Sequence, residues 1–200
     1  MKKMNQKGFT LIELLAVITI MGILMLVAIP AVQRLIRNTR RDTYADTAKQ
    51  YINAIKTAVV SDDLVCCENS ASCTKKEIST LTAGASSSSP KNYYYYFDSS
   101  QDSGKDLMDQ GGKSSFANAD VRGVIRIGKY VENNNIKYKY AIIMVDGTHG
   151  IGELKAATSD FESEENIGRS SVKMSGRSFN GISTGAGINA AKNDLCSLKG

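Results

Sequence analysis

The chain has 200 residues and a mass of 21.6 kDa, a length typical of one domain or of one domain with an extended element. Hydrophobic residues make up 42% and charged residues 22%, which excludes a disordered chain, and 17 Gly with 2 Pro exclude a collagen-like repeat. The formal net charge is +5, and it falls to +2 without the three lysines of residues 1–8. A mean hydropathy of −0.21 excludes a protein with many membrane spans.

The first predicted element is a long apolar helix close to the N-terminus. Only Thr19 has a polar side chain within residues 14–32. Extending this segment back to Phe9 adds two further polar residues, Thr10 and Glu13. About 20 consecutive apolar residues cross the hydrocarbon core of a bilayer, which is roughly 30 Å thick. The segment is therefore predicted to cross a membrane, and no later segment is long and apolar enough to do so.

Two ordinary interpretations of residues 1–32 fit poorly. A secretory signal peptide has an apolar region of roughly 7–15 residues and a small-x-small cleavage site, whereas this segment is longer and residues 28–31 lack the A-x-A spacing. A plain membrane anchor has the right length but does not account for Glu13, because an ionised carboxylate in hydrocarbon costs about 3 kcal/mol. A simple alternative is that Glu13 lies near the interface and extends its carboxylate to water.

The junction between the polar leader and the apolar run resembles the type IV prepilin signature. A short basic leader ends in Gly8, Phe9 follows, and Glu13 stands four residues after Phe9. The resemblance implies that a prepilin peptidase cleaves between Gly8 and Phe9 on the cytoplasmic side and that the new amine of Phe9 is N-methylated. It extends tightly to about residue 36 and loosely to about residue 60.

Two residues inside the apolar run also fit this resemblance. Gly22 and Pro30 lie where the family often has a glycine and a proline, which implies flexibility of the helix there. In a membrane helix a proline is often accommodated as a kink.

Elementary physical chemistry agrees with the resemblance. Cleavage after Gly8 removes the basic leader and leaves the apolar segment attached, so the product stays in the membrane. The carboxylate of Glu13 then has a candidate partner in the amine of Phe9 on a neighbouring subunit. A buried carboxylate is tolerated when it is paired with an opposite charge. Glu13 is therefore predicted to set the register of subunits during assembly.

The apolar helix is predicted to continue as an amphipathic helix beyond Pro30. Apolar residues recur there with helical spacing, at Val32, Leu35, Ile36, Ala45, Ala48, Ile52, Ile55 and Val59. Residues 61–63 favour caps and turns, so the helix is expected to end near Val60. A helix from Phe9 to Val60 is about 78 Å long at ~1.5 Å per residue.

Residues 61–92 show little periodicity, and the serine-rich segment 84–90 predicts an exposed loop. The aromatic run 93–97 favours a β-strand, and a core strand is preferred to an aromatic binding platform. Asp98, Asp102 and Asp106 are spaced too widely for an EF-hand calcium loop.

The clearest β-signal lies in residues 121–145, where two alternating segments flank a turn at 132–135 and predict an antiparallel hairpin. A third strand is expected at 151–154. The Gly-, Ser- and Asn-rich residues 156–200 are expected to wrap irregularly around the sheet edge.

These elements predict an α+β fold, in which a long N-terminal helix packs on a small antiparallel sheet, as in the pilin architecture. The predicted segments are a basic leader at 1–8, a membrane and polymerisation half-helix at 9–32, an amphipathic half-helix at 33–60 and a globular head at 61–200. Within the head we expect loops at 61–92, the sheet at 93–155 and the irregular region at 156–200.

The four cysteines are candidates for disulfides. Neighbouring Cα atoms lie about 3.8 Å apart, below the usual ~4.4–6.8 Å of a disulfide, so a bond between Cys66 and Cys67 is disfavoured. If two bonds form, Cys73 pairs with one of these two residues and Cys196 with the other. Free thiols and a zinc site are the alternatives, although no C-x₂₋₄-C spacing supports zinc.

The sequence contains no signature that indicates an enzyme. It lacks G-x-S-x-G, a Walker loop and H-E-x-x-H, and no Cys–His pair has a suitable third member. The single histidine, His149, stands in a glycine-flanked turn and is expected to be solvated rather than catalytic. No cofactor and no metal site are predicted.

The resemblance implies a structural subunit that polymerises through its N-terminal helix into a surface filament for adhesion, motility or aggregation. One alternative is a secretion-system pseudopilin that forms a short rod. Another is a competence-type pilin that contacts DNA, for which Lys137 and Lys139 beside Tyr138 and Tyr140 are the candidate residues. The nearly neutral body of the chain argues against nucleic acid as a partner.

The resemblance also implies partners and a location. The partners are other pilin subunits, a prepilin peptidase and methylase, and the pilus assembly machinery. The precursor would span the cytoplasmic membrane once, with the leader in the cytoplasm and the head outside. After assembly the subunit would belong to a pilus on the cell surface.

Overall fold

The computed structural model describes residues 10–69, 73–98, 107, 121–146, 149–154, 159–174 and 194–199. The chain divides into two compact units, Met1–Arg40 and Arg41–Gly200, which we call the N-terminal unit and the globular unit. Each unit is described by itself below. The predicted boundaries at residues 8, 32 and 60 remain predictions.

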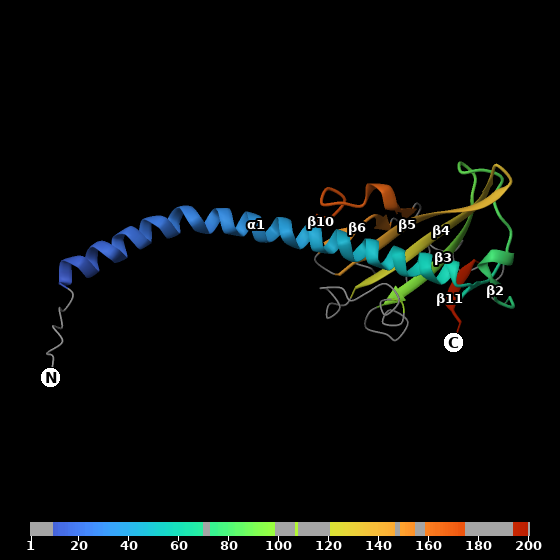
Figure 1. The fold of residues 1–200 in the computed structure, drawn as a ribbon, viewed down its shortest axis with the longest axis horizontal. Helices are drawn as coiled ribbons and strands as arrows, with labels where there is room; N and C mark the ends of the chain where they lie inside the picture. Colours follow the sequence, from blue (N-terminus) through green and yellow to red (C-terminus); the bar gives the residue numbers. More distant parts are fainter. Residues whose placement is uncertain are drawn as a thin grey trace, which may run out of the picture. The chain divides into compact units, whose positions relative to one another are not determined.

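A single helix, α1, extends over Leu11–Val60, which confirms the predicted long helix (Figure 1). Its 50 residues correspond to a length of about 75 Å. Pro30 lies inside α1, and the helix continues through it. Small and apolar side chains recur on the buried face of its second half, at Tyr44, Ala45, Thr47, Ala48, Tyr51, Ile52, Ala54, Ile55, Ala58 and Val59.

Within the described residues, the globular unit contains a nine-stranded sheet and a separate pair of strands. The sheet strands are β1 (Leu64–Cys66), β2 (Lys76–Glu77), β3 (Lys91–Asp98), β4 (Arg122–Glu132), β5 (Asn135–Val145), β6 (His149–Ile151), β9 (Glu162–Ser163), β10 (Lys173–Met174) and β11 (Leu195–Leu198). The separate pair is β7 (Glu153–Leu154) with β8 (Ser159–Asp160), and two short 3₁₀ helices are η1 (Ile78–Thr80) and η2 (Glu164–Asn166).

The sheet is mixed, because its last strand is parallel to a neighbour. The order is β10-β6-β5-β4-β3-β11-β1-β2, with β9 paired to β5. Strand β11 pairs in parallel with β3 and antiparallel with β1. The predicted α+β fold, with a long N-terminal helix on a sheet, is confirmed, and among the described strand pairings only β11 with β3 departs from the expected antiparallel arrangement. The C-terminal region is not confined to the sheet edge, because β11 lies between β3 and β1. A four-residue strand carries too little periodicity to be recognised, and its place depends on pairing with distant segments.

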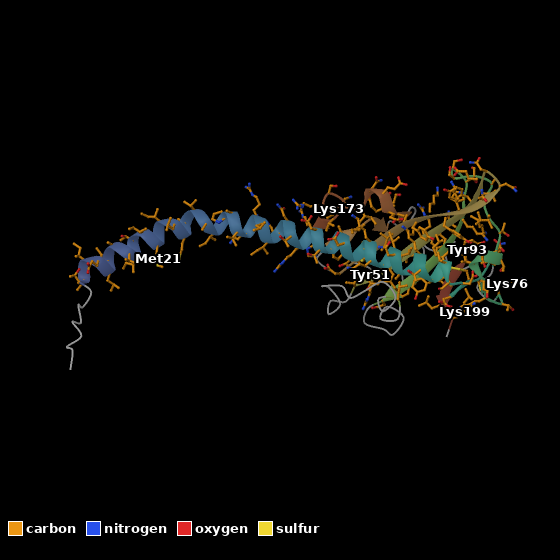
Figure 2. All side chains as sticks on the ribbon, viewed as in Figure 1. Met21, Tyr51, Lys76, Tyr93, Lys173 and Lys199 are labelled. Atoms are coloured by element: carbon orange, nitrogen blue, oxygen red, sulfur yellow. A yellow bond between two sulfur atoms is a disulfide. The ribbon has the colours of Figure 1, made fainter. Side chains whose placement is uncertain are left out.

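Strand β3 separates its aromatic residues onto two faces. Tyr93, Tyr95 and Phe97 are buried, and the Phe97 ring stacks on Tyr51 of α1 with centroids 4.1 Å apart. Figure 2 shows Tyr51 and Tyr93 within the globular unit. The alternate residue Tyr94 is half-buried and contacts Phe161 instead. The predicted core strand is confirmed for the face that packs on the helix.

The room for Phe97 comes from a glycine on the neighbouring strand. Gly123 of β4 is paired with Phe97 in the register of the two strands. A Cβ atom at Gly123 would lie 2.3 Å from Cζ of Phe97 and 2.6 Å from the carbonyl oxygen of Ile143. Glycine is therefore required by the close approach of the aromatic ring, not by an unusual backbone angle.

The long hairpin of β4 and β5 confirms the prediction for residues 121–145. Asn133 and Asn134 form its turn with φ angles of 50° and 61°. Two successive residues with positive φ are the requirement of a type I′ turn, which matches the right-handed twist of the strands. Asparagine tolerates this conformation better than most residues other than glycine.

The expectation that His149 is solvated is wrong. His149 is the first residue of β6, and it is only 6% exposed. Its ring stacks on Tyr44 of α1, and Nδ1 lies 3.0 Å from Oδ2 of Asp146. Burial raises the pKa of Tyr44. The reason is tertiary, since Tyr44 of α1 packs on the His149 ring, and no neighbour in sequence indicates this contact.

Residues 161–174 pair with the sheet through β9 and β10 and also pack on the helix. Arg169 donates two hydrogen bonds to the carboxylate of Asp42, and Lys56 forms an ion pair with Glu164. Ile167 and Val172 belong to the same buried cluster as the helix residues. Exposed ion pairs contribute little to stability, so burial of these two apolar side chains holds the segment in place.

The two disulfides join Cys66 to Cys196 and Cys67 to Cys73. Cys66 and Cys196 stand opposite each other in the register of β1 and β11. Because all four sulfur atoms form disulfides, neither free thiols nor a zinc site of four thiolates is present. The structure thus decides between the two pairings that the sequence left open.

A buried lysine supports the segment before β3. Lys129 of β4 is 1% exposed, and its Nζ atom donates hydrogen bonds to three main-chain carbonyl oxygens of residues 78, 79 and 81, at 2.9, 2.8 and 2.5 Å. Burial lowers the pKa of its ammonium group. The ammonium group of Lys129 therefore takes the place of water as the donor to the carbonyl oxygens in and directly after η1.

We expect Lys129→Met to lower the free energy of unfolding of the globular unit by about 3 kcal/mol, because each buried carbonyl left without a donor costs roughly 1 kcal/mol or more. Lys129→Ala should cost more, since it also leaves a cavity. Urea unfolding followed by tyrosine circular dichroism measures both. Lys139→Met is the matched control, because that side chain is exposed and, among the residues that the structure describes, its ammonium donates to the Ser87 carbonyl alone. Equal losses for the two methionine variants would contradict the role of Lys129.

Candidate functional site

The first residues of α1 form a reciprocal hydrogen-bonded cap. The backbone N–H and the hydroxyl of Thr10 each donate to Oε2 of Glu13, both at 2.8 Å. The backbone N–H of Glu13 lies 3.4 Å from Oγ1 of Thr10, which completes the pattern. This is a capping box, in which the first and fourth residues satisfy each other's free donors at a helix start.

The cap places a carboxylate at the beginning of an apolar helix. The positive end of the helix dipole and the two donors of Thr10 all favour the ionised form of Glu13 at this position. Oε2 accepts both hydrogen bonds from Thr10. Among the described residues, Oε1 accepts no hydrogen bond, so one oxygen remains able to accept from a donor outside this chain.

The helix after the cap exposes a continuous apolar surface. Seventeen large hydrophobic side chains from Leu11 to Ile36 are exposed, with exposed fractions from 46% at Ile36 to 84% at Leu11. Figure 2 labels one of them, Met21. Within the described residues, α1 is the one helix long and apolar enough to cross a membrane. Such a surface needs lipid or another apolar surface to cover it.

Comparison with known proteins identifies this segment. Residues 3–29 match the family model described as Prokaryotic N-terminal methylation motif. The chain carries the type IV pilin and pseudopilin signature. No curated protein and no solved structure matches the chain.

The methylation motif and the structure agree on a membrane-anchored precursor. The motif implies processing by a prepilin peptidase and assembly into a pilus-like polymer. Type IV pilins are structural proteins. The two residues of the implied cleavage site, Gly8 and Phe9, lie outside the described residues, and so does the implied N-methylation of Phe9. The roles of Gly8, Phe9 and Glu13 therefore stay predictions.

Gly22 and Pro30, the two residues expected to make the helix flexible, both lie inside α1. A Cβ atom at Gly22 would meet no other atom within 4 Å. No packing within the chain therefore requires glycine at this position. The flexibility expected of Gly22 and Pro30 remains a prediction.

Sequence analysis missed Thr10 as part of the site. The signal was present, because Thr10 and Glu13 have the T-x-x-E spacing of a capping box directly before an apolar run. The charge of Glu13 and the family resemblance do not by themselves indicate a role for Thr10. The hydrogen bonds of Glu13 to Thr10 add a second function, which is to cap the start of α1 directly after the predicted mature N-terminus, Phe9.

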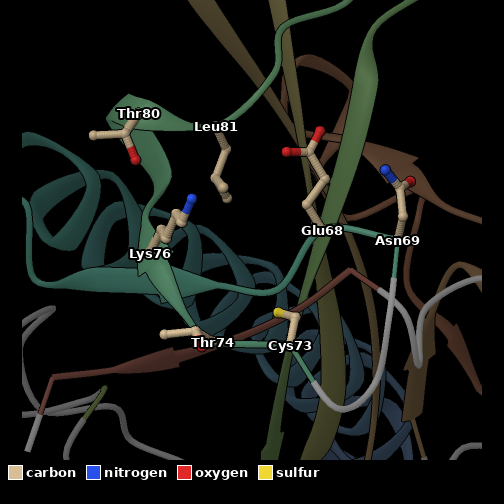
Figure 3. Close-up of a pocket in the computed structure, with 7 residues that line it drawn as sticks. All are labelled: Glu68, Asn69, Cys73, Thr74, Lys76, Thr80 and Leu81. Carbon is tan, nitrogen blue, oxygen red and sulfur yellow. The ribbon is translucent and has the colours of Figure 1, made fainter.

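A pocket of about 450 Å³ lies beside the disulfide of Cys67 and Cys73, and Figure 3 shows its lining residues. They are Glu68, Asn69, Cys73, Thr74, Lys76, Thr80 and Leu81. Hydrogen bonds from Thr82 and the charge of Lys91 hold the pKa of Glu68 below its usual value. A carboxyl group with a lowered pKa is a poor general acid near neutral pH.

The candidate DNA-contacting residues on β5 do not share a face. Lys137 pairs with Glu132, and Lys139 donates to the carbonyl of Ser87. Tyr138 and Tyr140 pack against the hydrophobic core on the other side of the strand, as the alternation of a β-strand requires. Within the described residues, no group of His, Cys, Asp and Glu side chains could hold a metal ion.

Proposed function

We propose that this chain is the precursor of a structural subunit of a type IV pilus or pilus-like filament. It is cleaved between Gly8 and Phe9, and the mature chain polymerises through its N-terminal helix for adhesion, motility or aggregation. The observation that carries the proposal is the methylation motif at residues 3–29, at the start of a helix whose apolar side chains are exposed up to Ile36. The chain is not an enzyme, and it needs no cofactor.

The same apolar surface serves two environments in succession. Before assembly, lipid covers the side chains of residues 11–36 in the cytoplasmic membrane, with the leader in the cytoplasm and the globular unit outside. After assembly, the same side chains of neighbouring subunits cover each other. Transfer between two apolar surroundings costs little free energy, whereas transfer into water would be prohibitive.

Glu13 provides specificity that the apolar side chains lack. The capping box holds Oε2 of Glu13, and Oε1 is available to the amine of Phe9 from an adjacent subunit. A subunit that docks at the wrong height leaves this amine unpaired in an apolar bundle, which is strongly unfavourable. Assembly therefore proceeds in one register.

The test is the N-terminus of the mature chain. On co-expression with a prepilin peptidase, Edman sequencing and intact mass should give a chain that begins with N-methylated Phe9. Gly8→Arg should block cleavage, because a large charged side chain replaces a residue without Cβ in the protease cleft. Gly22→Ala is the matched control, since the space around Gly22 accepts a methyl group, and it should be cleaved like the natural chain.

A mature chain that begins at Met1 or beyond Ala31 would contradict the proposal. A pseudopilin of a secretion system carries the same motif and shares the cleavage result. Electron microscopy of the cell surface separates the two functions, because a pilin forms long filaments outside the cell and a pseudopilin forms a short rod within the envelope. Separation of the lysines and tyrosines of β5 onto two faces gives no support to the DNA-binding alternative.

A further inference from the structure

The apolar part of α1 ends in a cluster of exposed arginines. Arg34, Arg37 and Arg40 are exposed, and within the described residues none of the three forms an ion pair. The sequence contains no Asp or Glu between Glu13 and Asp42. Asp42 itself is bound by Arg169. Three guanidinium groups within two helical turns therefore lack a neutralising charge from the described part of the chain.

These arginines share one side of the helix. Successive residues of an α-helix are turned by about 100°, so Arg34, Arg37 and Arg40 lie within an arc of about 120°. Val32, Leu35 and Ile36 lie on the opposite side, and all three are exposed. At this height the helix thus has a basic side and an apolar side, a pattern typical of segments at a membrane interface.

The height of the cluster along α1 matches the edge of a bilayer. From Leu11 to Arg34 the helix rises about 35 Å, slightly more than the ~30 Å hydrocarbon core that its apolar side chains would occupy. Arg34 therefore falls at the start of the headgroup region, and Arg37 and Arg40 fall within it. Arginine suits this region because its planar guanidinium donates two parallel hydrogen bonds to a phosphate.

The arginines do not serve to orient the helix. Lysines and arginines on the cytoplasmic side of a membrane helix normally set its orientation. Here the leader contributes Lys2, Lys3 and Lys7 before the apolar run, while Arg34, Arg37, Arg40 and Arg41 follow it. The numbers of positive charges on the two flanks are nearly equal, so they do not set the orientation of the helix. The arginines therefore have another role.

We propose that Arg34, Arg37 and Arg40 form a basic collar that binds the phosphate groups of anionic lipids in the leaflet next to the globular unit. The collar concentrates these lipids around the subunit and holds the helix at one depth in the membrane. This inference requires only that the apolar helix spans a bilayer, and it is independent of cleavage and polymerisation. Its failure and that of the proposed function are therefore distinguishable.

The absence of tryptophan from the chain permits a direct measurement. In the full-length chain, Ile36→Trp places a single tryptophan beside the collar. The chain is reconstituted into phosphatidylcholine vesicles that contain traces of dansyl-labelled phosphatidylglycerol or dansyl-labelled phosphatidylcholine. Energy transfer from the tryptophan to each labelled lipid gives the ratio of the two lipids at the collar.

We expect about fivefold enrichment of phosphatidylglycerol over phosphatidylcholine, which corresponds to the contribution of one basic residue near a membrane surface. The triple substitution R34Q/R37Q/R40Q should bring the ratio to about one, whereas R34K/R37K/R40K should retain most of the enrichment because the charge remains. The control K49Q/K75Q/K173Q removes three exposed lysines of the globular unit and should leave the ratio unchanged. Sodium chloride should weaken the enrichment through screening.

Four outcomes would overturn the proposal. One is a ratio of one for the natural arginines, and another is enrichment that persists in the glutamine variant. The third is an equal loss in the lysine-to-glutamine control, which would mean that the net charge of the whole chain attracts the lipid. Stronger displacement by inorganic phosphate than by sodium chloride of equal ionic strength would also overturn it, because free phosphate would then be the ligand.

Discussion

Replacement of both Cys66 and Cys196 by serine is expected to lower the free energy of unfolding of the globular unit by about 5 kcal/mol, the chain-entropy value for a bond between residues so far apart in sequence. The two residues are separated by 130 positions. The globular unit is then expected to be largely unfolded under mild denaturing conditions, since the total stability of a domain is only about 5–15 kcal/mol.

The structure gives a second reason for a large effect. Strand β11 lies between β3 and β1, so it forms hydrogen bonds on both sides. The pair Cys66–Cys196 is the covalent link that holds this short strand in its place. Without it, separation of β11 would leave β1 and β2 without a connection to the rest of the sheet. The loss of the bond therefore affects two strand pairings and not one.

The second disulfide is the matched control. Cys67 and Cys73 are separated by six positions, and the same chain-entropy relation gives about 2.5 kcal/mol for so small a loop. Urea unfolding of the detergent-solubilised chain, followed by tyrosine circular dichroism, compares the variants C66S/C196S and C67S/C73S. Equal losses, or a larger loss for C67S/C73S, would contradict the structural importance of the link to β11.

Substitution of Glu13 by alanine is expected to reduce filament assembly about 100-fold. The amine of Phe9 on the adjacent subunit would then lack its partner, and an unpaired charge in an apolar environment costs about 3 kcal/mol, equivalent to a factor of roughly 100. Glu13→Gln should behave similarly, because it preserves shape without charge. The fraction of mature chain in sheared filaments, measured against the membrane fraction, gives the result.

The capping box predicts a smaller effect for Thr10. Thr10→Val removes the hydroxyl donor to Glu13 and keeps the backbone donor. A lost helix cap costs about 1 kcal/mol, so assembly should fall about fivefold, and Thr10→Ser should restore it. Thr19→Val is the control, because the hydroxyl of Thr19 donates only to the carbonyl of Ala16 in its own helix.

Cleavage must be checked in each of these variants, since a precursor that keeps its leader cannot present the Phe9 amine. Intact mass identifies the mature chain before assembly is scored. Assembly of mature Glu13→Ala at the natural level would show that the carboxylate has no part in register. Equal losses for Thr10→Val and Thr19→Val would show that the polarity of the apolar helix, rather than the capping box, affects assembly.

Helix α1 followed from local sequence. A helix depends on contacts three and four residues apart, so the apolar run and its amphipathic continuation were sufficient to predict α1 up to Val60. The T-x-x-E spacing of Thr10 and Glu13 is equally local. The hairpin of β4 and β5 was predictable for the same reason, because its strands are adjacent in sequence and alternate regularly.

Contacts between distant segments were decided by the tertiary structure alone. The position of β11 beside β3 joins residues about 100 positions apart, and its four residues give no periodic signal. The choice between Cys66 and Cys67 as the partner of Cys196 followed from that strand register, since only Cys66 stands opposite Cys196. Burial of His149 against Tyr44 likewise required the fold of the chain. Local spacing thus determined α1 and the hairpin of β4 and β5, while burial and long-range pairing determined the place of β11, the disulfide partners and the burial of His149.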